Sequence, residues 1–171
     1  VSVLDAGKLA LKCELVDLAA IVQQAVSDAR AFSDGHAITL TVPASLEARV
    51  DPLRIEQVLA NLLNNALKYS PVESSIDVVI SQPLDAEIEL SVRDHGRGIP
   101  FEERNQIFER FYQAPDHGYT TGLGLGLYIS HQIVELHSGR IRAEFPPDGG
   151  TRFIVTLPVA ADVALAPASA D

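Results

Sequence analysis

The segment 52–69 carries the strongest pattern in the chain and limits the folds that are open to it. Apolar residues recur there at every third or fourth position, which is the spacing of one face of an α-helix. Asp51 is a good N-cap, Pro52 suits the first helical position, and Pro71 ends the pattern. The segment therefore predicts an amphipathic helix with one face against a core. The apolar face consists of Ile55, Val58, Leu59, Leu62, Leu63 and Ala66.

The rest of the chain alternates between helix and strand patterns. A second amphipathic helix is predicted over 15–33, with Asp17 able to cap its start, and shorter helices over 102–109 and 125–136. Short turns join many of the strands, which favours a mixed sheet with helices on one face. We therefore expect an α+β two-layer sandwich rather than a doubly wound parallel sheet. The predicted strands are 37–42 with 46–50 as its hairpin partner, 76–81 and 87–94 around a turn that contains Pro83, 140–145, and 151–157.

Length and charge narrow the class of protein. A chain of 171 residues holds about one domain, and we expect it over 15–158, followed by a flexible tail over 159–171. Asp and Glu number 23 against 13 Lys and Arg, a net charge of −10, which argues against nucleic acid and anionic membranes as partners. The single cysteine, Cys13, cannot form an internal disulfide, which fits a reducing compartment. No apolar run approaches the roughly 20 residues of a membrane span, and we expect a cytoplasmic location. Because the first residue is Val1 rather than Met, we also expect the chain to be a part of a longer protein.

A polar face lies opposite the apolar stripe of segment 52–69. Asn61, Asn65 and Lys68 fall within about 60° of each other on a helix that turns about 100° per residue. A solvated face is the ordinary explanation for any one of them. However, asparagine is a mediocre helix former, and Asn61, Asn64 and Asn65 all stand in mid-helix. Amide oxygens and an ammonium group suit hydrated Mg²⁺ and phosphates.

Two glycine motifs follow this helix. The run Asp94-His-Gly96-Arg-Gly98 comes directly after a predicted strand, and its carboxylate, which only accepts hydrogen bonds, can select a purine that bears an exocyclic amine. Alone it is a common turn. The run Gly122-Leu-Gly124-Leu-Gly126 enters a predicted helix but matches neither the dinucleotide fingerprint nor a Walker loop. It nevertheless places backbone N–H groups at a helix N-terminus, which suits a phosphate.

Taken together, the order and spacing of these motifs resemble the catalytic and ATP-binding domain of sensor histidine kinases. The resemblance covers roughly residues 15–158 and implies the Bergerat-type sandwich of the GHKL ATPases, in agreement with the fold class expected from the strand and helix patterns. The matching runs are 61–71 (N box), 94–100 (first glycine box), 107–112 (F box), 122–127 (second glycine box) and 149–151 (closing glycine motif).

The resemblance implies roles for individual residues. Asn65 would coordinate Mg²⁺, and Asp94 would accept the adenine amine. Asn61, Lys68 and Arg110 would face the phosphates of ATP and act in catalysis. Phe108 and Phe111 would brace the glycine-rich loop and face a partner helical domain. The other expected ATP contacts are Tyr69, Gly96, Gly98, Ile99, Gly122, Leu123, Gly124, Leu125, Gly126, Leu127 and Thr151.

The implied activity is transfer of the γ-phosphoryl group of Mg-ATP to a histidine, for relay to an aspartate on a response regulator receiver domain. None of the five histidines is followed by the acidic residue, Arg and Pro of the family's acceptor. The acceptor is therefore expected on a separate dimerisation domain, and residues 1–14 resemble the end of that domain and its linker. The resemblance implies a monomer for the isolated chain, a homodimer for the parent protein, and a parent that is cytoplasmic or anchored in a membrane.

Two departures from related patterns bear on the mechanism. Gyrase and heat-shock chaperones carry a glutamate general base where Asn61 stands, and asparagine cannot take a proton, so Asn61 favours transfer over hydrolysis. Many family members carry Arg or Lys at the position of Gln113, whereas the run from Phe111 to Leu127 contains neither. Charge on the γ-phosphate would then be met by Lys68, Arg110, Mg²⁺ and backbone N–H groups.

Two other functions stay open from the sequence. The same motifs would serve a serine-phosphorylating anti-sigma kinase or a true ATPase. Asn61 speaks against the ATPase, and the remnant of a dimerisation helix in residues 1–14 speaks against the anti-sigma kinase. The other alternative is a module that binds partners without catalysis, which the intact nucleotide motifs disfavour.

Overall fold

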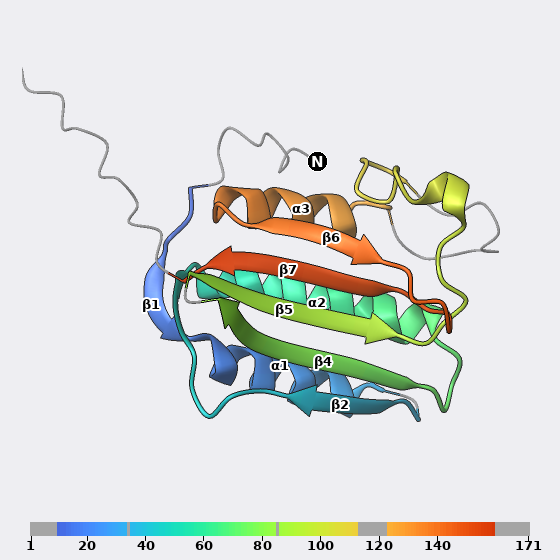
Figure 1. Ribbon diagram of the computed structural model, residues 1–171, viewed down its shortest axis with the longest axis horizontal. Coiled ribbons are helices and arrows are strands. Elements are labelled where there is room, and N and C mark those ends of the chain that lie inside the picture. The colour runs from blue at the N-terminus through green and yellow to red at the C-terminus, as the bar shows by residue number, and fades with distance from the viewer. Residues whose placement is uncertain (1–9, 34, 85, 113–122, 160–171) are drawn as a thin grey trace, which may run out of the picture.

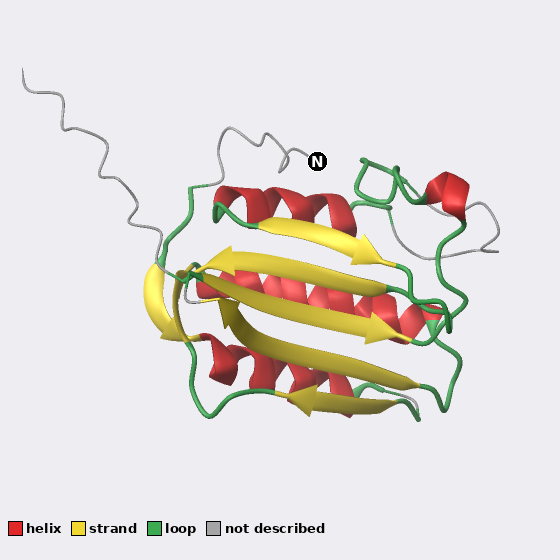
Figure 2. Ribbon diagram, viewed as in Figure 1, coloured by secondary structure: helices red, strands yellow, loops and turns green. Residues whose placement is uncertain are grey.

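The computed structural model describes residues 10–33, 35–84, 86–112 and 123–159. Within them lie a five-stranded sheet, a small two-stranded sheet and three α-helices (Figure 1). The helices are α1 (Leu18–Ala31), α2 (Pro52–Tyr69) and α3 (Gly126–Leu136), and all three lie on the same face of the large sheet (Figure 2). The predicted α+β two-layer sandwich is confirmed. The strands are β1 (Glu14–Asp17), β2 (Ala37–Thr41), β3 (Glu47–Val50), β4 (Ser75–Leu84), β5 (Glu87–Asp94), β6 (Arg140–Glu144) and β7 (Arg152–Pro158).

The large sheet has the strand order β2-β4-β5-β7-β6. Only β2 and β4 run parallel, and the chain between them passes through α2. The other neighbours are antiparallel. This order brings the end of β5 beside the start of β7, with Arg93 opposite Arg152 in the register.

Helix α2 has the limits that its sequence pattern predicts. The Asp51 carboxylate accepts a hydrogen bond from the Arg54 N–H at 3.3 Å, so the predicted cap is made. The whole apolar stripe is buried, and α2 lies between α1 and α3, in contact with both. Helix α2 thus lies at the centre of the helical layer, behind β5 and β7 in the view of Figure 1.

The end of α3 is tied to the start of α2 by a buried histidine. His137 Nε2 accepts a hydrogen bond from the Asp51 N–H at 3.0 Å, and its Nδ1 lies 2.8 Å from the Ile133 carbonyl oxygen. An Nε2 that accepts requires a neutral ring with the proton on Nδ1. The Asp51 carboxylate also accepts from the Lys12 N–H at 2.9 Å, so the segment before β1 meets both helices at one residue.

The face of the sheet that carries no helix is covered by ion pairs. Arg140 contacts Glu87 at 3.0 Å, and Arg142 contacts Glu89 at 3.5 Å. Ile154, which faces the same side as Arg142 in the register, is completely buried beneath these side chains. The aliphatic stems of arginine and glutamate thus shield the core from water where a second helical layer would otherwise be needed.

The predicted hairpin of 37–42 and 46–50 is wrong. Strand β2 pairs in parallel with β4, whereas β3 pairs antiparallel with β1 in the small sheet. The inward residues of β3, Ala48 and Val50, are buried in the core. The alternation of apolar and polar residues is the same whichever strand is the partner, so tertiary packing decided the pairing.

Three local expectations also need correction. Residues 102–109 do not form the predicted α-helix. A 3₁₀ turn, η1 (Phe101–Glu103), is followed by further turns. The backbone hydrogen bonds there span three residues rather than four, as from the Gln106 N–H to the Glu103 carbonyl. Pro83 lies within β4, beside a register shift, rather than in a turn. Helix α1 begins after its Asp17 cap, because the preceding residues are in β1.

No described helix combines the length and the apolar character that a membrane crossing requires. Most of the expected linker (1–9) and nearly all of the expected tail (160–171) lie outside the described residues.

Candidate functional site

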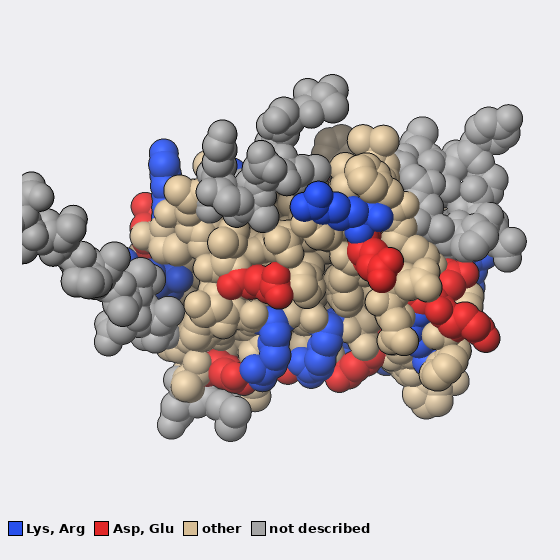
Figure 3. All heavy atoms as spheres, turned by 90° about the horizontal axis from the view of Figure 1, so that it is seen from above, with Lys and Arg blue, Asp and Glu red and all other residues tan. Residues whose placement is uncertain are grey.

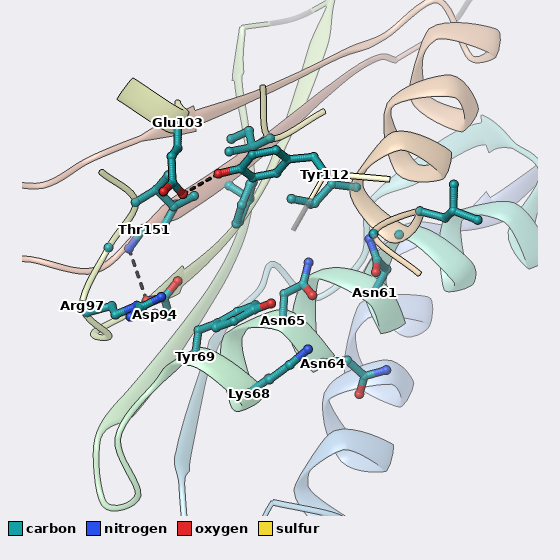
Figure 4. A pocket seen from close by; sticks show the side chains of 18 of the residues that line it. Asn61, Asn64, Asn65, Lys68, Tyr69, Asp94, Arg97, Glu103, Tyr112 and Thr151 are labelled. Atoms are coloured by element: carbon teal, nitrogen blue, oxygen red, sulfur yellow. Dashed lines mark hydrogen bonds between the residues drawn. The ribbon is translucent and has the colours of Figure 1, made fainter. Parts of the chain in front are cut away.

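A cavity of about 570 Å³ opens at the end of the sheet to which the polar face of α2 points. This volume lies within the usual range of small-molecule sites. Its walls come from α2, from the segments after β5 and before β7, and from the start of α3 (Figure 4). Residues almost 100 positions apart in the sequence therefore meet around one space.

The α2 wall is polar. Asn61, Asn65, Lys68 and Tyr69, all expected from the sequence, line the cavity together with Asn64. The Lys68 ammonium lies 5.1 Å from the centre of the Tyr69 ring, a cation–π distance. In Figure 4 Asn65, Lys68 and Tyr69 project from neighbouring turns of the helix. This wall offers amide oxygens and one ammonium group to a ligand.

Asp94 stands at the end of β5 and is 6% exposed. Its Oδ1 accepts hydrogen bonds from the Gly96 N–H at 2.9 Å and the Thr151 N–H at 3.3 Å. Burial raises the pKa of Asp94 above its ordinary value, although these two backbone bonds act in the opposite direction. Asp94 is therefore a fixed, poorly hydrated acceptor in the cavity wall.

The glycine motifs lie on both sides of the cavity. Gly98, Ile99 and Thr151 line one side. Gly96 does not line it, and its role in the structure is to hold the Asp94 carboxylate through its N–H. From the second glycine box, the lining residues are Leu123, Gly124, Leu125, Gly126 and Leu127. Gly122 and Gln113 lie outside the described residues.

Arg110 does not line the cavity. Its guanidinium donates a hydrogen bond to the Tyr128 hydroxyl at 2.7 Å and lies 4.7 Å from the centre of that ring. The two phenylalanines of the F box also separate. Phe108 packs against Phe153 inside the fold, with ring centres 6.3 Å apart, whereas Phe111 is 66% exposed.

Several lining residues are absent from the set expected from the sequence. Tyr112 and Glu103 line the cavity and are joined by a hydrogen bond from the Tyr112 hydroxyl to the carboxylate. Burial and this bond to a carboxylate raise the pKa of Tyr112 far above its ordinary value. The sequence offered a signal for some of these residues, because Asn64, Arg97, Pro100, Ile107 and Tyr112 lie within the recognised motifs. The other unexpected lining residues are Glu103, Ile129 and Phe153, which lie outside them.

The donor set of the cavity fits a magnesium ion that is carried by a phosphate ligand. Among the described residues there is no cluster of three or more His, Cys, Asp or Glu side chains that could hold a metal. Mg²⁺ binds oxygen donors, keeps several waters and usually takes its remaining ligands from substrate phosphates. The amide oxygen of Asn65, with Asn61 one helical turn away, suits that mode of binding.

Comparison with known proteins adds evidence from sequence. The family described as histidine kinase-, DNA gyrase B- and HSP90-like ATPase matches residues 50–161. The chain is 40% identical over 157 residues to the signal transduction histidine-protein kinase AfsQ2 of Streptomyces coelicolor, a match that covers 90% of this chain and 28% of that protein. It is 36% identical over 160 residues to the sensor histidine kinase TmoS of Ectopseudomonas mendocina, over 91% of this chain and 16% of that protein. The chain thus spans less than a third of these relatives.

Solved structures share the fold. The mycobacterial sensor histidine kinase MprB superimposes with a TM-score of 0.78 at 30% identity, over 85% of this chain and 97% of that one. Full-length ShkA in complex with AMPPNP gives a TM-score of 0.74 at 25% identity, over 90% of this chain and 32% of that one.

Proposed function

The chain belongs to the family of histidine kinase-, DNA gyrase B- and HSP90-like ATPases, and we propose that it is the ATP-binding catalytic domain of a sensor histidine kinase. In this proposal it transfers the γ-phosphoryl group of Mg-ATP to a histidine on a separate dimerisation and phosphoacceptor domain.

One observation carries the proposal. A buried carboxylate, Asp94, and the amide-rich wall of α2 with Lys68 line the same cavity. An acceptor without donor character suits the exocyclic amine of adenine, and amide oxygens with an ammonium suit magnesium and phosphates. ATP is a ligand that carries both groups.

The lining residues suggest how ATP would lie. The adenine amine would donate to Asp94, with Gly98, Ile99 and Thr151 beside the base. The phosphates would lie between the α2 wall and the start of α3, where Gly126 begins a helix of 11 residues. The free N–H groups and the dipole of that N-terminus favour an anion. The other proposed contacts on that side are Asn61, Asn65, Lys68, Tyr69, Leu123, Gly124, Leu125 and Leu127.

Magnesium would supply charge neutralisation and fix the geometry of the phosphates. We assign Asn65 to the metal through its side-chain oxygen. Lys68 would neutralise phosphate charge from the same wall. Arg110, expected at the γ-phosphate, would first have to leave the Tyr128 hydroxyl that it contacts in this structure.

The proposal of transfer rather than hydrolysis rests on the character of the α2 wall. Asn61 cannot accept a proton and so cannot activate water as a general base. Among the residues that the structure describes, two carboxylates line the cavity, and neither is on α2: Asp94 accepts two backbone hydrogen bonds, and Glu103 accepts the bond from Tyr112. The acceptor histidine would receive its general base from its own domain.

The proposed partners follow from the same activity. They are the dimerisation and phosphoacceptor domain of the same protein and the receiver domain of a response regulator. We propose a homodimeric parent protein with this domain in the cytoplasm, and a monomer for the isolated chain. Nucleic acid is not among the proposed partners, given the net charge of −10. On the face seen in Figure 3, the described basic side chains lie interspersed with acidic ones.

Calorimetric titration tests the nucleotide site, with ATP in the presence and absence of Mg²⁺ and with GTP as the control. We expect ATP to bind, to bind more tightly with Mg²⁺, and to bind more tightly than GTP. A phosphotransfer assay with a separately supplied acceptor domain then tests the reaction, with release of inorganic phosphate measured in parallel. No nucleotide binding, or release of phosphate without transfer, would refute the proposal.

A further inference from the structure

We propose that Ser130 is a positioning residue, which holds the Asn61 side chain and thereby sets the N-terminus of α3 against the phosphate-facing wall of α2. Neither the motifs nor the lining of the cavity single out this serine. The inference rests on the proposed function, because it concerns the phosphate end of the same site.

The contact joins two helices that provide opposite walls of the cavity. Asn61 Nδ2 donates a hydrogen bond to Ser130 Oγ at 2.9 Å, across 69 residues of sequence. Asn61 lines the cavity, whereas Ser130 lies behind it and is 1% exposed. In Figure 4 Asn61 lies beside α3, apart from Lys68 and Tyr69. Ser130 can therefore act on a ligand only through a neighbour.

The other end of the Asn61 amide packs against the first residue of α3. A Cβ atom built on Gly126 would overlap Asn61 Oδ1 and lie 2.8 Å from Cγ, so the amide and the Gly126 backbone are in close contact. The positive end of the α3 dipole favours an oxygen over an NH₂ group at this point. The amide nitrogen then faces Ser130, one turn farther along the helix.

These two contacts fix the distance and rotation between α2 and the α3 N-terminus. The N–H groups of that terminus are the proposed phosphate donors, and Asn65 and Lys68 are the proposed metal and phosphate ligands on α2. Loss of the Ser130 hydroxyl would leave the Asn61 NH₂ group without this partner and free the amide to rotate. Binding of phosphates should weaken, whereas binding of the base, at the Asp94 end, should not.

The test compares the wild type with Ser130→Ala in calorimetric titrations with Mg-ATP and with adenosine, which lacks phosphates. We expect Mg-ATP binding to weaken about 3- to 10-fold, the loss for one hydrogen bond between uncharged groups, and adenosine binding to stay the same. Thr156→Val is the matched control. It removes a buried hydroxyl that has no hydrogen-bond partner among the described residues and does not line the cavity, and it should change neither affinity.

A second background separates positioning from damage to the fold. If Ser130 acts through Asn61, then Ser130→Ala should cause no further loss of Mg-ATP affinity in a chain that already carries Asn61→Ala. Equal losses in both backgrounds, or an equal loss of adenosine binding, would overturn the inference.

Failure of the proposed function would be visible separately, as a wild type that does not bind Mg-ATP. The contact itself is then judged by urea unfolding of the wild type, Ser130→Ala, Asn61→Ala and the double variant. Non-additive changes in the free energy of unfolding support the Asn61–Ser130 interaction, and additive changes refute it.

Discussion

Replacement of Asp94 by asparagine is the most direct test of how the cavity would recognise a base. The amide oxygen of the new side chain can still accept the N–H groups of Gly96 and Thr151. Its NH₂ group would then replace the carboxylate oxygen that we assign to the adenine amine. Two donors would face each other, while a purine with a carbonyl at that position would gain a donor.

The expected magnitude follows from one hydrogen bond to a charged acceptor, about 1.5–3 kcal/mol. The Kd for ATP should therefore rise roughly 10- to 150-fold, and the preference over GTP should fall or reverse. Removal of the negative charge of Asp94 should by itself strengthen the binding of an anionic ligand. Because ATP and GTP carry the same phosphate charge, that effect cancels in the ratio of their affinities, which therefore reports on the hydrogen bond.

The same variant should stabilise the free protein. Burial raises the pKa of Asp94, so the native state binds the proton more tightly than the unfolded chain. The ionised carboxylate consequently lowers stability once the pH exceeds its unfolded pKa, and its removal should raise the melting temperature at neutral pH. Weaker binding together with a higher melting temperature cannot result from misfolding.

Calorimetry with ATP and GTP and a thermal melt are the assays. Asp148→Asn is the control, because it removes an exposed carboxylate that pairs with Arg93 at 2.6 Å outside the cavity lining. An unchanged Kd and an unchanged ATP-to-GTP ratio in Asp94→Asn would refute the assignment. An equal loss of affinity in Asp148→Asn would show that the effect is not specific to the buried carboxylate.

Three further changes test the site and its supports. Gly126→Ala would push a methyl group into the Asn61 amide, so Mg-ATP binding should weaken about tenfold, within the usual range for overpacking; unchanged calorimetric affinity would contradict this contact. His137→Ala removes the acceptor of the buried Asp51 N–H and should lower the free energy of unfolding by about 2–4 kcal/mol, seen as a lower urea midpoint; an unchanged midpoint would contradict it. Burial raises the pKa of the Asp51 carboxyl, but hydrogen bonds from backbone N–H groups outweigh burial, so the pKa is lower in the folded protein than in the unfolded chain. The ionised Asp51 therefore stabilises the fold fully above the pKa of the unfolded chain, and this stabilisation is lost as the pH falls through the pKa of the folded protein. Asp51→Asn can still cap the helix, so its urea midpoint should fall less than that of the wild type as the pH is lowered. An equal fall in both proteins would refute this expectation.

The accuracy of the sequence predictions follows the range of the interactions involved. The limits of α2 depend on the Asp51 cap, Pro52 and Pro71, all within two residues of its ends, and they were predicted to the residue. The partner of β3 depends on packing against β1, more than 30 residues away, and its prediction was wrong. The turns after Pro100 differ from a helix only in the span of their hydrogen bonds, which the apolar pattern does not encode.

The candidate site shows the same division. The polar groups of α2 and Asp94 could be predicted because they belong to motifs with defined spacing. Apolar wall residues such as Ile129 and Phe153 have the pattern of ordinary core residues, so nothing in the sequence marked them as lining a cavity. The direction of Arg110 depends on the Tyr128 hydroxyl, 18 residues away, and no local pattern predicts that contact.

The contact between Gly124 of the second glycine box and the end of the F box has a consequence for how such domains can diverge. A Cβ atom on Gly124 would lie 2.5 Å from the Tyr112 carbonyl oxygen and 2.8 Å from the Phe111 carbonyl carbon, so these two parts of the backbone are in close contact. When the ends of a connection already touch, doubling its length costs only about 0.6 kcal/mol of closure entropy. Insertions and deletions between these two positions can therefore accumulate in evolution, or be engineered as sites for a tag or reporter, while the walls of the cavity keep their places.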